Sequence, residues 1–203
     1  KAGDFILAPG TSQYNARLQY QTYDVSGLLN VGKNEILVTV GDGWWRGDTG
    51  YGGVRNSFGT DLAILCQLEI DRKTVLISDK SWSASQEGPL GLNDLMQGEC
   101  YDARKENICE WHPVTEKQFG YENLVCSNSF DVVEKENFTG KQIHTPNGEV
   151  VIDFGQNIAG YVKFGFYAQA GQCITLYHGE CLDQNGNFTQ ENFQAPEHRV
   201  EQC

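Results

Sequence analysis

The chain has few basic side chains and few prolines, and it has no long apolar run. These shortages limit the kinds of partner that we expect it to bind. Its 203 residues hold 15 Lys and Arg against 27 Asp and Glu, for a formal net charge of −12, and only 5 Pro. The basic residues are scattered, and an acidic chain without a basic patch repels phosphate, so we expect no nucleic-acid partner. No apolar run approaches the roughly 20 residues that span a bilayer. We therefore expect no membrane partner either.

Catalytic and metal-binding signatures are also missing. The sequence has no GxSxG, HExxH, GxGxxG or P-loop pattern, and its four His are isolated from one another. Carboxylate pairs such as Glu180 with Asp183 are plentiful among 27 acidic residues, so no pair stands out as the two carboxylates of a glycosidase. We assign no catalytic residue on this chain.

The seven cysteines contain no CxxC pair, which argues against a zinc cluster. Cys66 lies in an apolar run, where a free thiol packs as a small hydrophobe. Free thiols favour a reducing compartment, so we expect a cytoplasmic protein. The chain opens at Lys1 without an initiator Met or a signal peptide, as the middle of a longer polypeptide would.

Short apolar runs that end in Gly, Asn or Asp turns recur along the chain. They are Ile36–Val40, Leu62–Ile70, Thr74–Ile77, Val150–Phe154, Tyr161–Tyr167 and Gln172–Tyr177. No helical pattern of 10–15 residues separates them, so we predict an all-β fold of antiparallel β-sandwiches. One helical turn is expected at Val25–Leu29, with Asp24 as its cap.

A polar stretch between about Glu116 and Lys141 predicts a domain boundary. It contains the run Glu134-Lys135-Glu136-Asn137. We place one domain at residues 1–118 and a second at 119–203, which then begins with the apolar run at Leu124–Cys126.

The segment Gly41 to Gly47 contains Trp44, Trp45 and Arg46. Adjacent side chains on a strand point to opposite faces, so one indole is expected in the core and the other on the surface. An exposed indole suits the apolar face of a sugar ring, and an Arg offers donors to its hydroxyls. The alternative is that both indoles are structural, with Arg46 stacked on one.

A Gly-flanked loop, Gly91 to Glu99, is rich in side-chain oxygen atoms. Asn93, Asp94 and Glu99 carry the oxygen ligands that calcium prefers, and calcium can in turn accept sugar hydroxyls. Asn93 and Asp94 are therefore also candidates for sugar binding. The spacing is not that of an EF-hand, and side chains that merely stabilise a turn are the alternative interpretation.

Five segments together resemble the part of bacterial α-L-rhamnosidases that precedes the catalytic barrel. They are Leu7 to Val25, Gly43 to Gly47, Asn93 to Arg104 (with the run Gly98-Glu99-Cys100-Tyr101-Asp102-Ala103-Arg104), Asp153 to Tyr161, and His178 to Asp183 with Asn185 to Phe193 behind it. They cover nearly the whole chain in the family's order. Where this chain has Trp45, the family more often has Tyr.

The resemblance implies a jelly-roll, or galactose-binding-like, module at residues 1–118 and the next β-sandwich, truncated at Cys203, at 119–203. It implies a bacterial parent enzyme that removes terminal L-rhamnose from glycosides by an inverting mechanism. The acidic residues that do so would lie on an (α/α)6 barrel, C-terminal to this chain. In some relatives the first module binds rhamnose through calcium, which again suggests Asn93, Asp94 and Glu99.

Three hypotheses about function follow. In the first, this is the non-catalytic, carbohydrate-binding and scaffolding portion of an α-L-rhamnosidase, whose partners are an L-rhamnose-containing glycoside and the catalytic barrel of the same chain. In the second, the sandwiches are purely structural and pack on that barrel, or serve as the sugar-binding module of another glycoside hydrolase. In the third, the chain is a stand-alone enzyme that uses a carboxylate pair.

Overall fold

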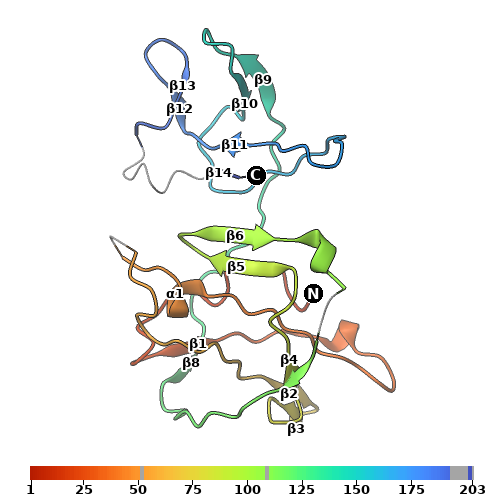
Figure 1. The fold of residues 1–203 in the computed structure, drawn as a ribbon. Coiled ribbons are helices and arrows are strands. Elements are labelled where there is room, and N and C mark those ends of the chain that lie inside the picture. The colour runs from red at the N-terminus through yellow and green to blue at the C-terminus, as the bar shows by residue number, and fades with distance from the viewer. Residues whose placement is uncertain (51–52, 108–109, 193–200, 203) are drawn as a thin grey trace. The chain divides into compact units, whose positions relative to one another are not determined.

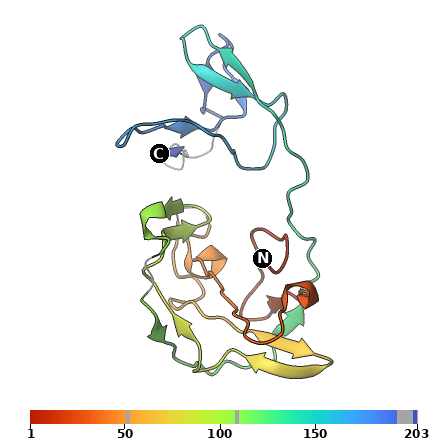
Figure 2. The same ribbon diagram turned by 90° about the vertical axis from the view of Figure 1, so that its right-hand side faces the viewer.

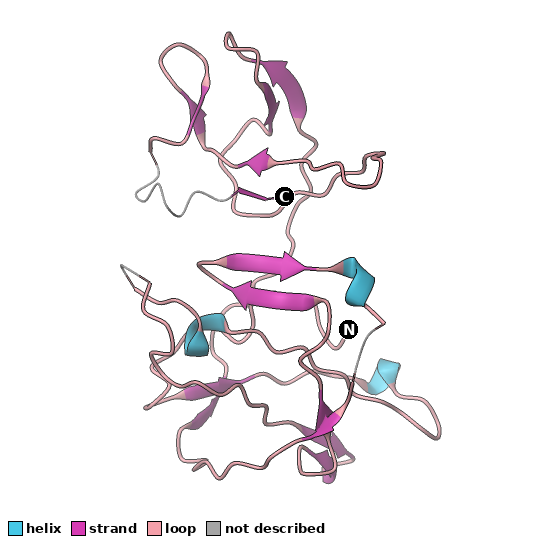
Figure 3. Cartoon of the chain, viewed as in Figure 1, coloured by secondary structure: helices cyan, strands magenta, loops and turns pink. Residues whose placement is uncertain are grey.

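The chain forms two compact units, Lys1–Val133 and Glu134–Cys203, in the computed structural model (Figure 1). The structure describes residues 1–203 apart from 51–52, 108–109, 193–200 and 203. Cys109, Phe193 and Cys203, which the sequence reasoning included, lie outside the described residues. The described chain is almost all strand and loop (Figure 3), so the predicted all-β class is confirmed.

The first unit contains eight described strands and three single helical turns. The strands are β1 (Leu18–Tyr20), β2 (Gln67–Ile70), β3 (Lys73–Ile77), β4 (Ser83–Ala84), β5 (Leu90–Asp94), β6 (Gly98–Tyr101), β7 (His112–Pro113) and β8 (Leu124–Cys126). The turns are η1 (Ser26–Leu28), α1 (Gly43–Arg46) and η2 (Ala103–Lys105). The strands pair as β1 with β8, β2 with β3, β4 with β7 and β5 with β6. The yellow hairpin in Figure 2 is the β2–β3 pair.

The β2–β3 hairpin forms where the sequence predicts it. Asp71 and Arg72 occupy the turn with positive φ, at 51° and 63°, which is the backbone of the two-residue turn that matches strand twist. The helical turn predicted at Val25–Leu29 forms as the shorter 3-10 turn η1, but its N-cap is Val25, so the prediction of Asp24 as the cap is wrong. The Asp24 carboxylate accepts a hydrogen bond from the Ser26 backbone N–H at 2.9 Å.

The pair β1–β8 is parallel, whereas the other described pairs are antiparallel. The antiparallel prediction is wrong for this pair, because the long chain between Tyr20 and Leu124 allows a crossover where a hairpin would force reversal. The pairing also puts β8 in the first unit, although the polar stretch had placed it in the second domain, 119–203. The two units divide at Val133, later than the boundary at 118.

The second unit contains six short described strands. They are β9 (Lys141–His144), β10 (Val150–Asp153), β11 (Leu176–Tyr177), β12 (Cys181–Leu182), β13 (Phe188–Thr189) and β14 (Glu201–Gln202). They pair as β9 with β10, β11 with β14 and β12 with β13, all antiparallel. Gly148 and Gly186 sit in the β9–β10 and β12–β13 turns with φ of 85° and 81°, a backbone that glycine adopts without steric cost.

Two predicted strands are absent from the described structure. Ile36–Val40 and Tyr161–Tyr167 run as irregular chain. An apolar run forms a strand only if another strand is available to hydrogen-bond with it. Neither segment has such a partner among the described residues. Phe164 and Phe166 stack on each other instead, with ring centroids 5.4 Å apart.

Burial in the described residues is polar rather than apolar. No apolar side chain there is fully buried, whereas Asp42, Asp48, Asp94 and Thr145 are 4–7% exposed. Three of these four residues come together in the first unit. Buried carboxylates must be paired with cations or hydrogen-bond donors. The contacts of these aspartates therefore fix the local structure around them.

Candidate functional site

Two motifs that are far apart in the sequence meet in the first unit. The tryptophan loop, residues 41–56, contains α1, and the helical turn contacts β5. The backbone N–H of Asp42 donates to the Asn93 carbonyl at 2.9 Å. The backbone N–H of Asp48 donates to Oδ2 of Asp94 at 2.9 Å. The predicted sugar-binding residues therefore lie on one assembled surface region rather than on two.

Asp94 is the central anchor of this assembly. Its side chain is fully buried, and Oδ1 accepts the backbone N–H groups of Met96 and Gln97 at 2.8 and 2.9 Å. Oδ2 accepts from Asp48 and from the Arg55 guanidinium, the latter at 2.9 Å. Burial acts to raise the pKa of Asp94, but these bonds to the ionised form outweigh it, so the pKa lies below its ordinary value.

Arg55 neutralises the buried carboxylates. Its Nη2 donates to Asp42 Oδ2 at 2.6 Å, and its Nη1 lies 2.9 Å from Asp94 Oδ2 and 3.5 Å from Asp48 Oδ1. The hydrogen bond to Asp42 is the main cause that raises the pKa of Arg55, with further attraction from the other two carboxylates. A planar guanidinium suits this task because its donors diverge in one plane.

Arg46 and Gln97 complete the network. Arg46 Nε donates to Asp42 Oδ1 at 2.7 Å, four residues away across α1. The Gln97 amide donates to Asp48 Oδ2. Arg46, predicted to hold sugar hydroxyls, is thus engaged by a buried carboxylate. Sequence reasoning missed Arg55, Asp42 and Asp48. A signal was present in the three Asp of glycine-rich turns, because buried carboxylates need a cation nearby.

The adjacent tryptophans do not lie on a strand, so the prediction of opposite strand faces is wrong. Gly43 has φ of 51° and the Arg46 N–H donates to the Asp42 carbonyl at 3.1 Å, which closes the helical turn α1. In a helical turn, side chains four residues apart lie on the same face, so Arg46 reaches the Asp42 carboxylate. In a strand the two side chains would be too far apart to pair. The local ion pair therefore favours the turn.

Trp45 has a structural role. Its ring packs edge-on against Tyr14, with centroids 5.5 Å apart, and stacks on Phe58 at 6.3 Å. Its indole N–H donates to the Asp61 carbonyl at 3.0 Å. Both the apolar face and the polar atom of Trp45 are thus occupied, which leaves this side chain unsuited to a ligand.

Trp44, Asn93 and Glu99 remain accessible at the edge of the network. Trp44 is half-buried, and in the described part of the chain no aromatic ring stacks on it. Asn93 Nδ2 donates to Glu99 Oε2 at 3.0 Å, which holds an amide and an exposed carboxylate side by side. An indole offers an apolar face, and an amide paired with a carboxylate offers hydrogen-bonding atoms to hydroxyl groups.

The described contacts do not fit a calcium site at Asn93, Asp94 and Glu99. A carboxylate has about four lone-pair positions, and all four of Asp94 are used by N–H donors, one of them on a cationic guanidinium. Across the described residues, no group of three His, Cys, Asp or Glu side chains is placed to hold a metal ion. Asp94 therefore acts here as an anion that positions backbone.

Gly47 is one point of close approach between the tryptophan loop and β5. A Cβ at this position would meet the Gly43 carbonyl oxygen and come within 2.7 Å of Asp94 Oδ2. We expect Gly47→Ala to lower the free energy of unfolding of the first unit by about 1–3 kcal/mol, the usual effect of overpacking. Urea unfolding followed by Trp fluorescence measures it, since all four Trp lie in residues 1–133.

Gly91→Ala is the matched control for Gly47→Ala. Gly91 is exposed on the neighbouring strand, and its nearest atom to an added Cβ lies 3.9 Å away, an ordinary contact. The control is expected to unfold close to the parent chain. Equal unfolding midpoints for both variants would contradict the close packing at Gly47.

Comparisons with known proteins agree with this all-β arrangement. Residues 1–143 match the α-L-rhamnosidase N-terminal domain, and residues 143–202 match the bacterial α-L-rhamnosidase concanavalin-like domain. The second match supports a β-sandwich. No solved structure shows a significant match to the chain.

Three curated relatives are similar along almost all of this chain. An α-L-rhamnosidase of Streptomyces avermitilis is 31% identical over 96% of the chain, one of Formosa agariphila 28% over 95%, and one of Alteromonas sp. 28% over 93%. The chain spans 20–22% of the length of these relatives. The chain is thus a β-rich segment that corresponds to the N-terminal region of glycoside hydrolases. It belongs to the bacterial α-L-rhamnosidase family.

Proposed function

We propose that this chain is the non-catalytic, carbohydrate-binding and scaffolding portion of an α-L-rhamnosidase. The observation that carries the proposal is the match to two consecutive domains of that family over residues 1–202. The whole protein would remove terminal L-rhamnose from glycosides with inversion, on a barrel outside this chain. The chain's partners would be that barrel and a rhamnose-containing glycoside.

The binding surface in this proposal is the edge of the aspartate network. In this proposal Trp44 supplies an aromatic face, and the paired Asn93 and Glu99 supply hydrogen-bonding atoms from β5 and β6, the first of which contacts the helical turn α1. The buried Asp94 and its partner Arg55 fix the loop that carries Trp44 to the strand that carries Asn93. A preformed arrangement of this kind lowers the entropy lost when a sugar binds.

A catalytic role for the buried aspartates is disfavoured by the lowered pKa of Asp94 and by the ion pairs of Asp42. A glycosidase acid must hold its proton near neutral pH, which requires a raised pKa. Asp94 has a lowered pKa, and Asp42 is paired with both Arg46 and Arg55. Asp94 therefore stays ionised, and the oxygen atoms of Asp42 are occupied by guanidinium groups, which supports a binding and scaffolding role over a stand-alone enzyme.

Titration of the chain with L-rhamnose by calorimetry tests the proposal. We expect saturable binding without release of rhamnose from an aryl rhamnoside. Trp44→Ala should weaken binding roughly tenfold or more, because an aromatic anchor contributes more than about 1 kcal/mol. Trp111→Ala is the matched control, since Trp111 is an exposed tryptophan of the same unit outside the network. Equal affinities of the two variants would remove Trp44 from the site.

Chelator separates the calcium expectation from sugar binding itself. Because the lone pairs of Asp94 are occupied, we expect the affinity for L-rhamnose to be the same in calcium and in excess chelator. Loss of binding in chelator would contradict the described contacts. No binding in either buffer by a folded chain would instead favour the purely structural scaffold.

The state of the cysteines indicates the cellular compartment of the protein. Cys66, Cys100, Cys126 and Cys181 are free thiols, and burial raises the pKa of Cys66, which makes that thiol less reactive. Free thiols persist in a reducing compartment. The proposal therefore keeps the protein in the bacterial cytoplasm.

A further inference from the structure

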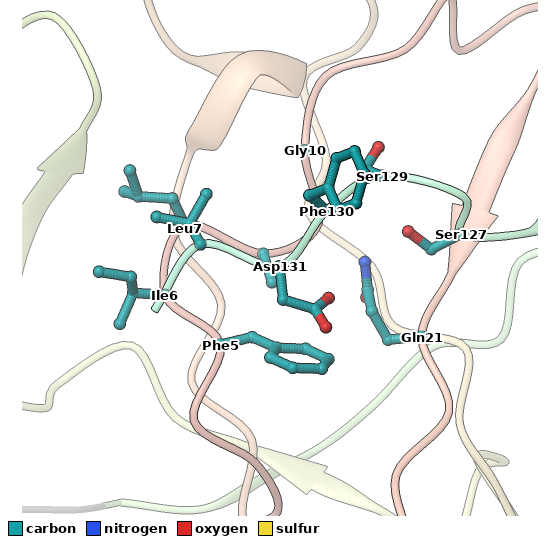
Figure 4. A pocket seen from close by; sticks show the side chains of 11 residues that line it. Phe5, Ile6, Leu7, Gly10, Gln21, Ser127, Ser129, Phe130 and Asp131 are labelled. Atoms are coloured by element: carbon teal, nitrogen blue, oxygen red, sulfur yellow. The ribbon is translucent and has the colours of Figure 1, made fainter. Parts of the chain in front are cut away.

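A separate pocket lies where the N-terminal segment meets the strand end after β8. It has a volume of about 150 Å³ and is lined by residues 5–8, 10, 21, 127 and 129–132. Figure 4 shows the ring of Phe5 along one side, with the Asp131 carboxylate directed toward the Gln21 side chain. The whole pocket belongs to the first unit.

Hydrogen bonds around the pocket hold its walls together. The Ile6 backbone N–H donates to the Val132 carbonyl at 2.9 Å, which ties the N-terminal segment to the far wall. The Gln19 amide donates to Asn128 at 3.0 Å and accepts from the Ser129 hydroxyl at 3.3 Å. The parallel pairing of β1 with β8 continues into these contacts. The pocket is thus formed before any ligand arrives.

Three polar side chains that line the pocket are not used by the fold. In the described part of the chain, the Gln21 amide, the Asp131 carboxylate and the Ser127 hydroxyl enter no side-chain hydrogen bond or ion pair, unlike Ser129. Together they offer donors and acceptors in several directions. Beside them Phe5 and Ile6 supply apolar surface, and Phe5 is braced by Tyr23 with ring centroids 5.3 Å apart.

The size and charge of the pocket limit its occupant. About 150 Å³ is well below the roughly 300 Å³ at which pockets for drug-sized ligands begin. One carboxylate and no cationic side chain line it, so an anion is excluded. A small neutral ring with hydroxyl groups on its edge and a C–H face toward Phe5 satisfies every one of these constraints.

We propose that the pocket formed by Phe5, Gln21, Ser127 and Asp131 binds one neutral monosaccharide ring, as a second sugar site apart from the Trp44 surface. The inference deepens the proposed function, on which the choice of sugar as ligand class rests. Asp131 and Gln21 receive and donate hydrogen bonds at the ring's hydroxyls. The Phe5 ring covers its apolar face.

The test is made in the Trp44→Ala chain, where the first site is removed. Saturation-transfer NMR with L-rhamnose, D-glucose and ethylamine as probes is expected to show residual binding of a sugar. Adding Asp131→Asn or Gln21→Ala should weaken that residual binding by about tenfold or more, since each removes a group that orients the ring. Glu134→Gln, a change at an exposed carboxylate outside the pocket, is the matched control.

Each outcome separates this inference from the proposed function. Sugar binding that Trp44→Ala abolishes entirely would overturn the second site and leave the proposed function intact. Sugar binding that only the Asp131 and Gln21 variants weaken would support the pocket and remove Trp44 from the proposed function. Binding of ethylamine alone would overturn the sugar assignment. Far-UV circular dichroism of each variant shows that the loss is not one of folding.

Discussion

Asp94→Ala is expected to destabilise the first unit by about 3 kcal/mol. The substitution leaves the backbone N–H groups of Asp48, Met96 and Gln97 without an acceptor and Arg55 without one of its carboxylates. Unpaired buried donors and broken buried ion pairs are among the costliest changes in proteins. Urea unfolding followed by Trp fluorescence measures the loss.

Asp102→Ala is the control for that result. Asp102 also accepts from an arginine, Arg104, at 2.8 Å, and this hydrogen bond is the main cause that lowers the pKa of Asp102 to about 2. The pair lies at the surface, however, where solvent screens it, so little change in stability is expected. If Asp94→Ala were as mild as Asp102→Ala, Asp94 would not be the anchor of the tryptophan loop.

Trp45→Ala is expected to have a similarly large effect, about 3 kcal/mol, at the low end for the loss of a packed aromatic ring. The change removes the ring that joins Tyr14 to Phe58 and the N–H bond to the Asp61 carbonyl. The same unfolding experiment reports it, because three Trp remain in the unit. Affinity for L-rhamnose should fall only as far as the folded fraction does.

Trp45→Phe and Trp111→Ala are the controls for the loss of stability expected in Trp45→Ala. Phe keeps an aromatic ring but not the N–H, so it should lie between the parent and Trp45→Ala. Trp111 is about half exposed, at 49%, and its removal should change stability little. A weaker affinity for sugar in a fully folded Trp45→Phe chain would contradict the purely structural role of Trp45.

The hairpin of β2 and β3 shows what the sequence is able to predict. Its two apolar runs flank Asp71 and Arg72, and turn and strand preferences act over only a few residues. The same locality explains the single turn after Asp24. Such features need no information from distant parts of the chain.

The pairing of β1 with β8 and the turn at the tryptophans show what local preference leaves open. Leu18 pairs with Leu124, and nothing in either run specifies a partner so far away. Trp44 and Trp45 favour strands by type, but the Arg46 bond to Asp42 and the packing of Gly47 against Asp94 outweigh that preference. A tertiary contact decides the first case, and a local ion pair together with the tertiary packing of Gly47 decides the second.

The sequence named Trp44, Asn93 and Asp94 as candidates in two separate motifs, and only the structure shows that the helical turn α1 contacts β5. Arg46 and Trp45, also named as candidates, are used by the fold itself. Arg55 was missed because a lone arginine between Val54 and Asn56 belongs to no local sequence motif. Its role depends on three acidic residues up to 39 positions away, a distance over which sequence spacing gives no guidance.

The bonds from Asp94 to Asp48 and Arg55 also set an order of events as the chain folds. The hairpins β2–β3 and β5–β6 close short loops and form from neighbouring residues alone. The contact between Asp48 and Asp94 closes a loop of 46 residues, and the entropy of such a closure must be met before the contact stabilises anything. We therefore expect the network to form late in folding and to slow unfolding more than it speeds folding.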